Sequence, residues 1–195
     1  MQAAPDPDFT WLNEPPLWRR SVDGVSLVTG KRTDFWQATF YGFHRDDGHA
    51  LLQPVAGDFT ASATVLGRYE HLYDQAGLML RIDATNWIKT GIEYTDGMMH
   101  FSVVVTRGVS DWSVIPLPNA VPADPVRVRL TRHGDAVRIH YAVGAMDWQM
   151  ARLAPFSSAD AAVGIMACSP ERSGFEATFS DIAVGPPIAR QLHAE

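Results

Sequence analysis

The chain has 195 residues, enough to bury one sizeable core, and all-β sandwiches of this length commonly form a single domain. Its residues are 46% hydrophobic and 19% charged, with a mean hydropathy of −0.09, which argues against a membrane span and against extensive disorder. The 16 Lys and Arg against 22 Asp and Glu give a net charge of −6 without a basic block, so nucleic acid is not an expected partner.

Cysteine usage and the N-terminus bear on the compartment. The single cysteine, Cys168, cannot form an intrachain disulfide. The opening residues, MQAAPDPDF, have neither a basic start nor the apolar run of a secretory signal. We therefore expect a cytoplasmic protein.

The chain is predicted to be mostly β, because 13 prolines and 15 glycines punctuate short stretches rich in Val, Ile, Thr and aromatic residues. In chain order, the predicted strands are Leu17–Arg20, Val25–Thr29, Ala50–Val55, Phe59–Tyr69, Gln75–Asp83, Trp87–Thr95, Met98–Arg107, Trp112–Leu117, Val126–His133, Ala136–Val143, Trp148–Leu153, Val163–Cys168 and Phe175–Val184. This spacing predicts an all-β jelly-roll sandwich of two antiparallel sheets. We expect one domain over residues 1–195, with a core from about 9 to 184 and short tails.

A turn signal fixes one part of the register. Asp96-Gly97 is typical of a two-residue type I′ turn joining Thr95 to Met98. On one side of the hairpin, the predicted pairs are Glu93 with His100, Gly91 with Ser102, Lys89 with Val104 and Trp87 with Thr106. On the other side they are Tyr94 with Met99, Ile92 with Phe101, Thr90 with Val103 and Ile88 with Val105, the apolar set that a sandwich core requires.

The preceding strand, Gln75–Asp83, can pair in two registers. Its apolar face matches that of the next strand only if the connection has an odd number of residues. A three-residue loop would place Arg81 opposite Lys89, whereas a five-residue loop would place Gln75 opposite Glu93. In either register, one side of three adjacent strands carries Gln75, Arg81, Lys89, Glu93 and His100.

This polar side has the composition of a ligand platform. Trp87 and Met79 lie among the charges, and Gly77 and Gly91 leave room in the middle. An aromatic ring beside charged groups suits a sugar or polyol, because the ring stacks on apolar sugar faces while Arg, Lys and carboxylates bind hydroxyls. The alternative is a solvated sheet face with cross-strand charge pairs. We favour ligand binding.

Catalysis is a further alternative for the same face. A carboxylate beside an imidazole could supply acid/base chemistry, and Glu93 is predicted to face His100, with Lys89 nearby. Glycosidases need two carboxylates, yet only Glu93 sits in the middle of a strand here, so a loop residue such as Asp34, Asp74 or Asp111 would have to join it. A structural hydrogen bond is the competing interpretation of the Glu93–His100 pair.

Other motifs are weaker. The stretch HRDDGH, from His44 to His49, could hold a metal, but Asp-Asp-Gly is typical of an ordinary turn, which we favour. Cys168 lies in an apolar strand and is expected to be a core residue. Trp112 could pack in the core or lie at the rim of a site. No cofactor and no metal site is predicted.

Several sequence blocks together resemble one family. They are WLNEPP from Trp11 with Trp18, Thr33–Trp36, Tyr41–Phe43, Asp47–His49, Tyr73–Arg81, Trp87–Glu93, Val104–Thr106 and Ser110–Ser113. From about Phe9 to Val184 the chain is similar to the "regulation of enolase" family of concanavalin A-like lectin/glucanase-superfamily proteins, a domain of unknown function. It also resembles the accessory domain at the C-terminus of some β-xylosidases.

The resemblance implies a curved jelly roll whose concave face carries the ligand in related lectins and glucanases. We therefore expect a carbohydrate or related polar metabolite on that face. The predicted ligand-binding residues are Asp34, Trp36, Gln75, Arg81, Trp87, Lys89, Glu93, His100, Ser102 and Asp111, with Asp34, Trp36 and Asp111 at the rim. The alternatives are a glycan-active hydrolase or lyase using Glu93, His100 and Lys89, and a protein-interaction module regulating a metabolic enzyme such as enolase.

Overall fold

A computed structural model describes residues 9–192 of the chain, and β-strands dominate it. The strands are β1 (Thr10–Leu12), β2 (Leu17–Ser21), β3 (Gly24–Val28), β4 (Phe35–Gln37), β5 (His44–Asp46), β6 (His49–Val55), β7 (Phe59–Gly67), β8 (Gln75–Asp83), β9 (Asn86–Thr95), β10 (Met98–Arg107), β11 (Val109–Pro116), β12 (Val126–His133), β13 (Ala136–Val143), β14 (Gln149–Pro155), β15 (Ala161–Cys168) and β16 (Glu176–Gly185). Within this part of the chain, no helix is long and apolar enough to cross a membrane.

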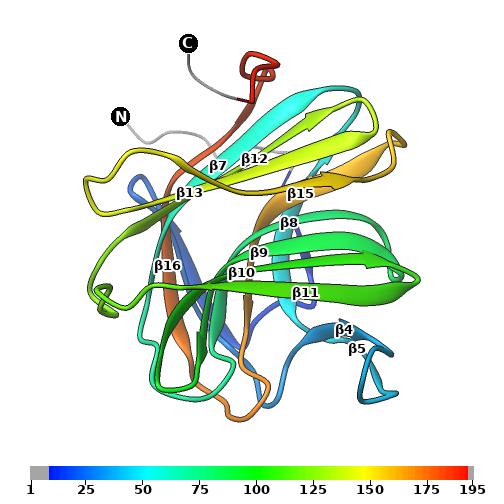
Figure 1. The fold of residues 1–195 in the computed structure, drawn as a ribbon. Helices are drawn as coiled ribbons and strands as arrows, with labels where there is room; N and C mark the ends of the chain where they lie inside the picture. The colour runs from blue at the N-terminus through cyan, green and yellow to red at the C-terminus, as the bar shows by residue number, and fades with distance from the viewer. Residues whose placement is uncertain (1–8, 193–195) are drawn as a thin grey trace.

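The strands form two large antiparallel sheets that pack face to face (Figure 1). The front sheet has the strand order β1-β6-β15-β8-β9-β10-β11, and the back sheet has the order β14-β13-β12-β7-β16-β3-β2. A separate two-stranded hairpin, β4–β5, lies beside the front sheet. The predicted all-β jelly-roll sandwich is confirmed.

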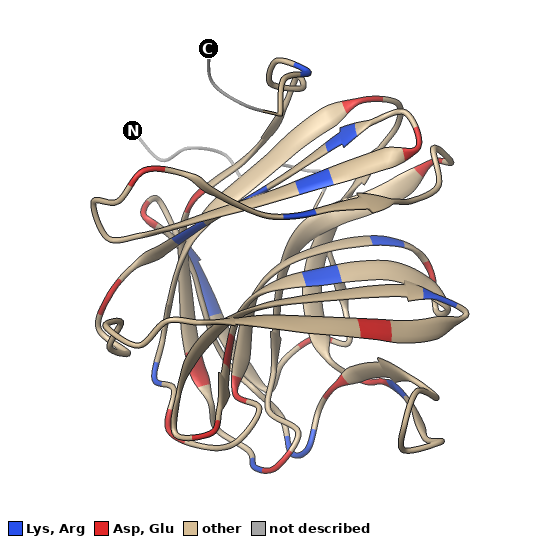
Figure 2. Ribbon diagram, in the orientation of Figure 1, with Lys and Arg blue, Asp and Glu red and all other residues tan. Residues whose placement is uncertain are grey.

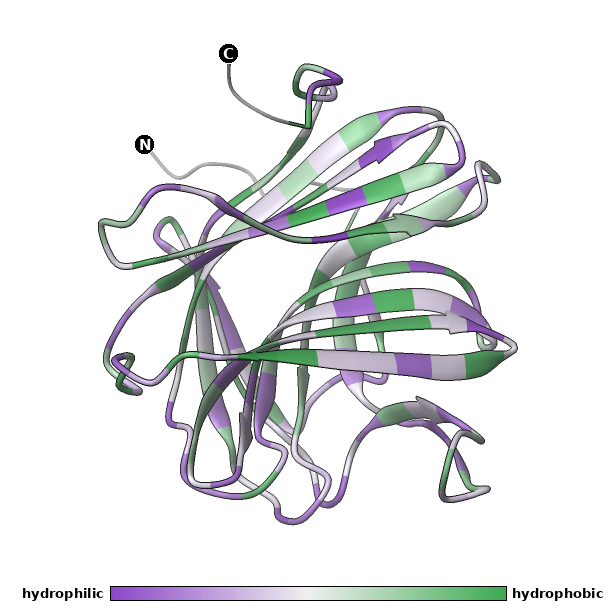
Figure 3. Cartoon of the chain, in the orientation of Figure 1, coloured by the Kyte–Doolittle hydropathy of each residue, from purple (hydrophilic) through white to green (hydrophobic). Residues whose placement is uncertain are grey.

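The core lies between the sheets and follows the alternation of the strands. From the front sheet, Leu78, Ile88 and Phe101 point inward, and Leu130 and Ile139 meet them from the back sheet. Apolar and polar bands alternate along the strands of both sheets (Figure 3). This arrangement buries one face of each sheet and leaves the two outer faces available for polar side chains.

The β9–β10 hairpin has the predicted register. Asp96 and Gly97 both have positive φ angles, 53° and 75°, as a type I′ turn requires. Glu93 pairs with His100, and Ile92 pairs with Phe101. The turn signal and the apolar pattern therefore located every partner in this hairpin correctly.

The β8–β9 pair combines one predicted register with an unpredicted turn. Gln75 faces Glu93, as expected for the longer of the two loops. The connection is nevertheless shorter than either prediction, because β8 extends to Asp83 and β9 begins at Asn86. A register shift between Arg81 and Asp83 takes up the difference. The Asp83 carboxylate accepts hydrogen bonds from the backbone N–H of Thr85 and from the Asn86 side chain, which fastens the tight turn.

Three strands escaped prediction because each has only three residues: β1, β4 and β5. In the stretch HRDDGH, for which a turn was favoured, His44–Asp46 form β5, and Asp47-Gly48 is a two-residue connection to β6. Of these unpredicted strands, the hairpin β4–β5 matters most for the site described below, because it lies against the outer face of the front sheet.

Candidate functional site

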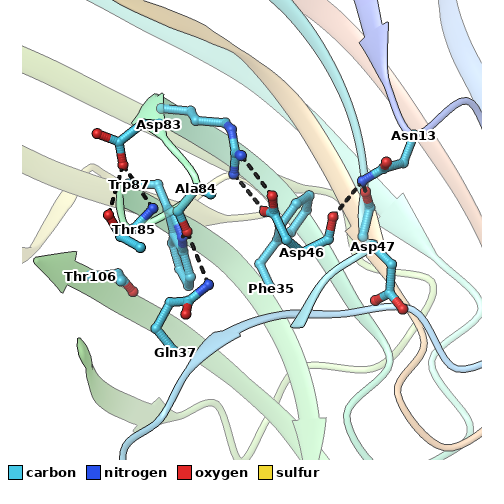
Figure 4. Close-up of polar contacts among 12 residues, drawn as sticks. Asn13, Phe35, Gln37, Asp46, Asp47, Asp83, Ala84, Thr85, Trp87 and Thr106 are labelled. Carbon is cyan, nitrogen blue, oxygen red and sulfur yellow. Dashed lines mark hydrogen bonds and ion pairs between the residues drawn. The ribbon is translucent and has the colours of Figure 1, made fainter. Parts of the chain in front are cut away.

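The β4–β5 hairpin is fastened across one end of the front sheet by polar contacts (Figure 4). The Gln37 side-chain amide donates to the backbone oxygen of Ala84 over 3.0 Å, and the backbone N–H of Gln37 donates to the Ser110 hydroxyl over 2.9 Å. Arg81 donates two hydrogen bonds to the Asp46 carboxylate, at 2.7 and 2.8 Å. A bidentate Arg–carboxylate pair fixes orientation as well as distance, so the hairpin has a defined place over the sheet.

Beneath the hairpin lies a second, smaller apolar cluster. Its buried members are Phe35, Ala50, Leu52, Met79, Trp87, Val104, Met166 and Cys168. Phe35 packs on Trp87 with 6.2 Å between ring centroids. Trp87 is completely buried, and its indole N–H donates to the backbone oxygen of Ala84 over 3.1 Å. This corrects the prediction that Trp87 stacks on a ligand: the hairpin covers the ring, which instead supports the floor of the site.

Beside this cluster, a pocket of about 380 Å³ opens on the outer face of the front sheet. It is lined by Arg32, Asp34, Trp36, Tyr41, Phe43, Arg45, Tyr73, Gln75, Lys89, Glu93, Val104, Trp112, Pro170 and Glu171. The floor comes from β8, β9 and β10, and the β4–β5 hairpin forms one wall. Segments far apart in the sequence therefore build one concave site.

A buried ion pair forms part of the floor. The Lys89 ammonium lies 2.7 Å from a carboxylate oxygen of Asp34, and both side chains are nearly inaccessible to solvent. Burial alone would lower the pKa of Lys89, but the neighbouring carboxylates of Asp34 and Glu93 outweigh burial and raise it above the usual value. Lys89 is therefore a fixed positive charge at neutral pH. It can donate to a ligand hydroxyl or to an anionic group.

Glu93 is the second carboxylate of the floor. Burial raises its pKa above the usual range, against the opposing effect of the Lys89 charge. One carboxylate oxygen accepts from the Gln75 amide over 3.3 Å, and the other accepts from the Trp112 indole N–H over 3.0 Å. Both donors hold the carboxyl in place. A carboxyl with a raised pKa that faces a pocket can act as an acid or base as well as a hydrogen-bond acceptor.

The predicted pairing of Glu93 with His100 is present in the backbone register but not as a side-chain contact. The nearest hydrogen-bond partner of the His100 ring is the backbone oxygen of Met98, at 3.3 Å. His100 is buried and does not line the pocket. Among residues 9–192, the side chains bonded to Glu93 are Gln75 and Trp112. Adjacent Cα positions do not by themselves bring a carboxylate and an imidazole together.

The remaining predicted residues divide between the pocket and its surroundings. Five of the ten, Asp34, Trp36, Gln75, Lys89 and Glu93, line the pocket. The hydroxyl of Ser102 accepts from the Trp112 indole N–H over 3.0 Å and so helps to place that ring. Arg81 is committed to Asp46, and Asp111 pairs with Arg152 at 2.6 Å. Arg81 and Asp111 therefore lie outside the pocket, holding neighbouring elements together.

Four aromatic residues that were not assigned to the site also line the pocket: Tyr41, Phe43, Tyr73 and Trp112. Tyr41 and Phe43 stack with 5.4 Å between centroids, and Tyr73 meets Trp112 edge-on at 6.5 Å. Burial, together with the nearby Tyr41 hydroxyl, raises the pKa of Tyr73 to about 12, so it stays a neutral donor. Tyr41, Phe43 and Tyr73 belong to blocks that carried the family resemblance, which was the available signal. Trp112, which alternation left undecided, is a wall residue.

No three His, Cys, Asp or Glu side chains between residues 9 and 192 come together as metal ligands. His44 and His49, which framed the alternative metal interpretation, are both engaged within the protein. His44 is 2.6 Å from the Gln37 amide oxygen, and His49 accepts from the backbone N–H of Gly30 over 2.9 Å. Cys168 is buried, as expected of a core residue, and burial raises the pKa of its thiol.

The two packed antiparallel sheets define the class of protein: an all-β jelly-roll sandwich. The Bacteroides ovatus protein Xyloglucan PUL GH43B superposes with a TM-score of 0.69 at 17% identity, over 92% of this chain and 36% of that one. The carbohydrate binding module CBM66 from Bacillus subtilis superposes with a TM-score of 0.55 at 14% identity, over 90% and 94% of the two chains. At such identity these likenesses show the shared fold alone.

Residues 11–187 match the family described as "Protein of unknown function (DUF1349)", and the chain belongs to this family. It is 44% identical over 188 residues to the Saccharomyces cerevisiae protein named "Regulation of enolase protein 1", covering 94% of this chain and 92% of that protein. A crystal structure of a functionally unknown protein from Saccharomyces cerevisiae superposes with a TM-score of 0.89 at 42% identity, over 94% of this chain and 98% of that one. The resemblance read from the sequence is confirmed.

Proposed function

We propose that the front-sheet pocket binds a carbohydrate or a related polar metabolite. The observation that carries this proposal is the combination of aromatic walls with a charged, hydrogen-bonding floor. The walls include Trp36, Tyr41 and Trp112, and the floor holds Lys89 and Glu93. Aromatic rings stack on the apolar faces of sugars, while charged groups bind the hydroxyls, so this composition fits a sugar better than it fits a purely apolar ligand.

The size and rigidity of the pocket support the same function. A volume of about 380 Å³ lies within the usual range for small-molecule sites. Glu93 is held by two donors and Lys89 by Asp34, so the floor is organised before a ligand arrives. The shared fold with a carbohydrate binding module is consistent with this function.

Ligand screening with a matched control tests the proposal. Isothermal titration against a panel of monosaccharides, oligosaccharides and sugar acids should identify a binder of the unmodified protein. Trp112→Ala should weaken that binding by about tenfold or more. Trp18→Ala is the matched control, because Trp112 and Trp18 are both 41% exposed and Trp18 lies on β2 of the back sheet. Equal affinity of both variants would contradict binding in this pocket.

A glycan-active hydrolase or lyase is the second candidate, favoured by two carboxyl groups, Glu93 and Asp34, that line one pocket. Glu93 would be the acid/base, and its raised pKa supports that role. Lys89 would supply positive charge. Glu93→Gln should then abolish turnover of a glycan while retaining its binding. If the unmodified protein binds a glycan without forming detectable product, the result would contradict catalysis and support binding alone.

A protein-interaction module that regulates a metabolic enzyme is the third candidate. The name of the yeast relative, "Regulation of enolase protein 1", supports it. The hairpin tip also presents Phe40, which is 92% exposed, next to Tyr41 and Phe43. Such a cluster of exposed aromatic rings suits a protein contact. Pull-down of enolase by the unmodified chain, lost in Phe40→Ala and retained in Trp112→Ala, would favour this function over sugar binding.

A further inference from the structure

The outer face of the back sheet carries a second concentration of charge, remote from the pocket. The four adjacent strands β14, β13, β12 and β7 contain no Asp or Glu, whereas they contain five arginines. Blue bands mark β12 and β13, while red lies in the connections at their ends (Figure 2). In a chain with a net charge of −6, this one-sided distribution needs a physical explanation.

Strand pairing gathers four basic side chains into one cluster, the back-sheet cluster: Arg127 and Arg129 on β12, and Arg138 and His140 on β13. Arg129 lies directly opposite His140. On a strand, residues two apart lie about 7 Å from each other on the same face, and direct cross-strand neighbours about 5 Å. Four basic groups within these distances can reach a single small ligand.

Trp148 holds two of these arginines in position. Its ring lies 4.2 Å from the guanidinium carbon of Arg129 and 5.1 Å from that of Arg127. Arg127 also donates to the backbone oxygen of Met146 over 2.5 Å. Stacking on an aromatic ring leaves the edge of a guanidinium group free to donate hydrogen bonds. The arrangement therefore orients donors without neutralising their charge.

The cluster has no acidic partner in the part of the chain that the structure describes, residues 9–192. Arg138 is 5% exposed and His140 is 8% exposed, yet the Nε atom of Arg138 and the Nδ1 atom of His140 have no hydrogen-bond partner there. The Nε atoms of Arg127 and Arg129 are also buried without a partner. Buried, unpaired donors on charged groups are costly, and an anion in contact with them removes that cost.

The electrostatics agree with this geometry. Burial, together with the charges of Arg129 and Arg138, lowers the pKa of His140 to about 4. His140 is therefore neutral at pH 7, and the two arginine charges contribute to the lowered pKa in addition to burial. By contrast, Arg152 on β14 of the same sheet has its own carboxylate, that of Asp111.

We propose that the back-sheet cluster is a binding site for a phosphate-bearing small molecule, held by Arg127, Arg129 and Arg138 with His140 beside them. A phosphate group offers three acceptor oxygens and up to two negative charges, which matches several converging guanidinium donors better than a single carboxylate does. Arg127 and Arg129 are only half-buried, so a ligand can reach the cluster from solvent. This site lies on the opposite sheet from the proposed sugar pocket and does not depend on it.

Thermal unfolding with inorganic pyrophosphate as the probe tests this site. In a buffer of constant ionic strength balanced with sodium chloride, millimolar pyrophosphate should raise the Tm of the unmodified protein by about 3 °C. Arg129→Gln should remove at least two thirds of that shift. Arg19→Gln, an exposed arginine on β2 of the same sheet, makes the same change in net charge and should retain the full shift.

A site-resolved measurement locates the ligand. Pyrophosphate beside the cluster should raise the pKa of His140, followed by NMR of the imidazole, because the anion offsets the charges of Arg129 and Arg138. Two results of the unfolding experiment would overturn the proposal: a Tm shift no larger than with chloride alone, or an equal shift in Arg129→Gln and the unmodified protein. A Tm shift without any change at His140 would place the anion elsewhere, and would overturn it as well.

Discussion

The two outer faces of the sandwich handle positive charge in opposite ways. On the front face, three cations in or beside the pocket have their own carboxylates: Lys89 pairs with Asp34, Arg81 with Asp46 and Arg45 with Asp47. On the back sheet, Arg127, Arg129 and Arg138 have none within residues 9–192. Paired charges shape a pocket and fix a hairpin, whereas unpaired charges create a field that attracts an anion. The same residue types thus have different consequences on the two faces.

This difference in charge pairing comes from the segments that lie over the two outer faces. The β4–β5 hairpin brings Asp34, Asp46 and Asp47 onto the front face together with Phe35. The back face is crossed by the end of the chain, where Arg138 donates to the backbone oxygen of Ala189 over 2.8 Å. A backbone oxygen accepts a hydrogen bond but carries no net charge. The β4–β5 hairpin therefore neutralises positive charges of the front sheet beneath it. The described end of the chain does not neutralise those of the back sheet.

The largest effect on stability is expected from truncating Phe35, the apolar side chain that packs the β4–β5 hairpin against the front sheet. Phe35→Ala should lower the free energy of unfolding by about 4 kcal/mol, because Phe35 is fully buried against Trp87 and a cavity would remain. Chemical denaturation measures the loss. Phe40→Ala makes the same chemical change at a side chain that is 92% exposed, and should alter stability by less than about 0.5 kcal/mol. Similar losses in the two variants would mean that the hairpin is not anchored by this ring.

A somewhat smaller effect is expected from breaking the buried ion pair of the pocket floor. Lys89→Met should destabilise the protein by about 3 kcal/mol, because it leaves the Asp34 carboxylate buried without its counter-charge. The double change Lys89→Met with Asp34→Asn should recover part of that loss in the same denaturation experiment. The exposed pair supplies the comparison: Arg45→Met removes the partner of Asp47 and should cost about 1 kcal/mol or less. A double variant no more stable than Lys89→Met alone would count against an unpaired Asp34 as the cause.

Sequence patterns predicted the strand register of the β9–β10 hairpin in the front sheet, but not the β4–β5 hairpin that lies over the sheet. Asp96-Gly97 fixed the hairpin register, and the apolar alternation at Ile88, Ile92 and Phe101 correctly identified the core face. The pattern also showed that Trp87 lies on the other face, which is true. It could not show that β4, from a segment about fifty residues earlier, covers that ring, because a three-residue strand has too few positions to show alternation.

The same limit applies to the back sheet. Arg127 and Arg129 alternate with core residues in VRVRL, so their outward direction could be read from the sequence. The cluster itself required β12 to pair with β13, which brings Arg138 and His140 alongside. No short window of the sequence holds more than two of its members. Charge clusters assembled by strand pairing are invisible to a search for basic blocks. Nine of the fourteen residues that line the pocket were missed for a related reason, because most of them lie in connections that only the fold brings together.

Protonation of the pocket floor should change stability in a pH-dependent way. Burial raises the pKa of Glu93 in the folded state above the usual glutamate value of 4.5. The folded state therefore holds this proton more tightly than the unfolded chain does, and the resulting stability is complete below pH 4.5 and lost as the pH rises through the folded pKa. The Glu93→Gln variant lacks this titration. Its free energy of unfolding, relative to that of the unmodified protein, should increase from pH 4 toward pH 7 in denaturant titrations.

Exposed Glu176, paired with Arg68, provides the control for that measurement. Glu176→Gln makes the same replacement without burial, so its stability relative to the unmodified protein should be nearly flat over the same pH range. A flat difference for Glu93→Gln as well would show that the folded-state pKa of Glu93 is not raised. It would also remove the argument for Glu93 as an acid/base group.

The smallest expected effect comes from comparing one arginine on each face of the sandwich. Arg81→Gln on the front sheet should lower the free energy of unfolding by about 1 to 2 kcal/mol, because it breaks a bidentate pair with Asp46. Arg129→Gln on the back sheet, in phosphate-free buffer, should change it by less than about 0.5 kcal/mol or increase it slightly, because the loss of stacking on Trp148 is offset by relief of repulsion from Arg127 and Arg138. The two variants change net charge equally, so denaturation in parallel isolates the surroundings of each arginine. Equal destabilisation would mean that Arg129 is neutralised by a group of the chain itself, and that the two faces do not differ in the way the ion pairs indicate.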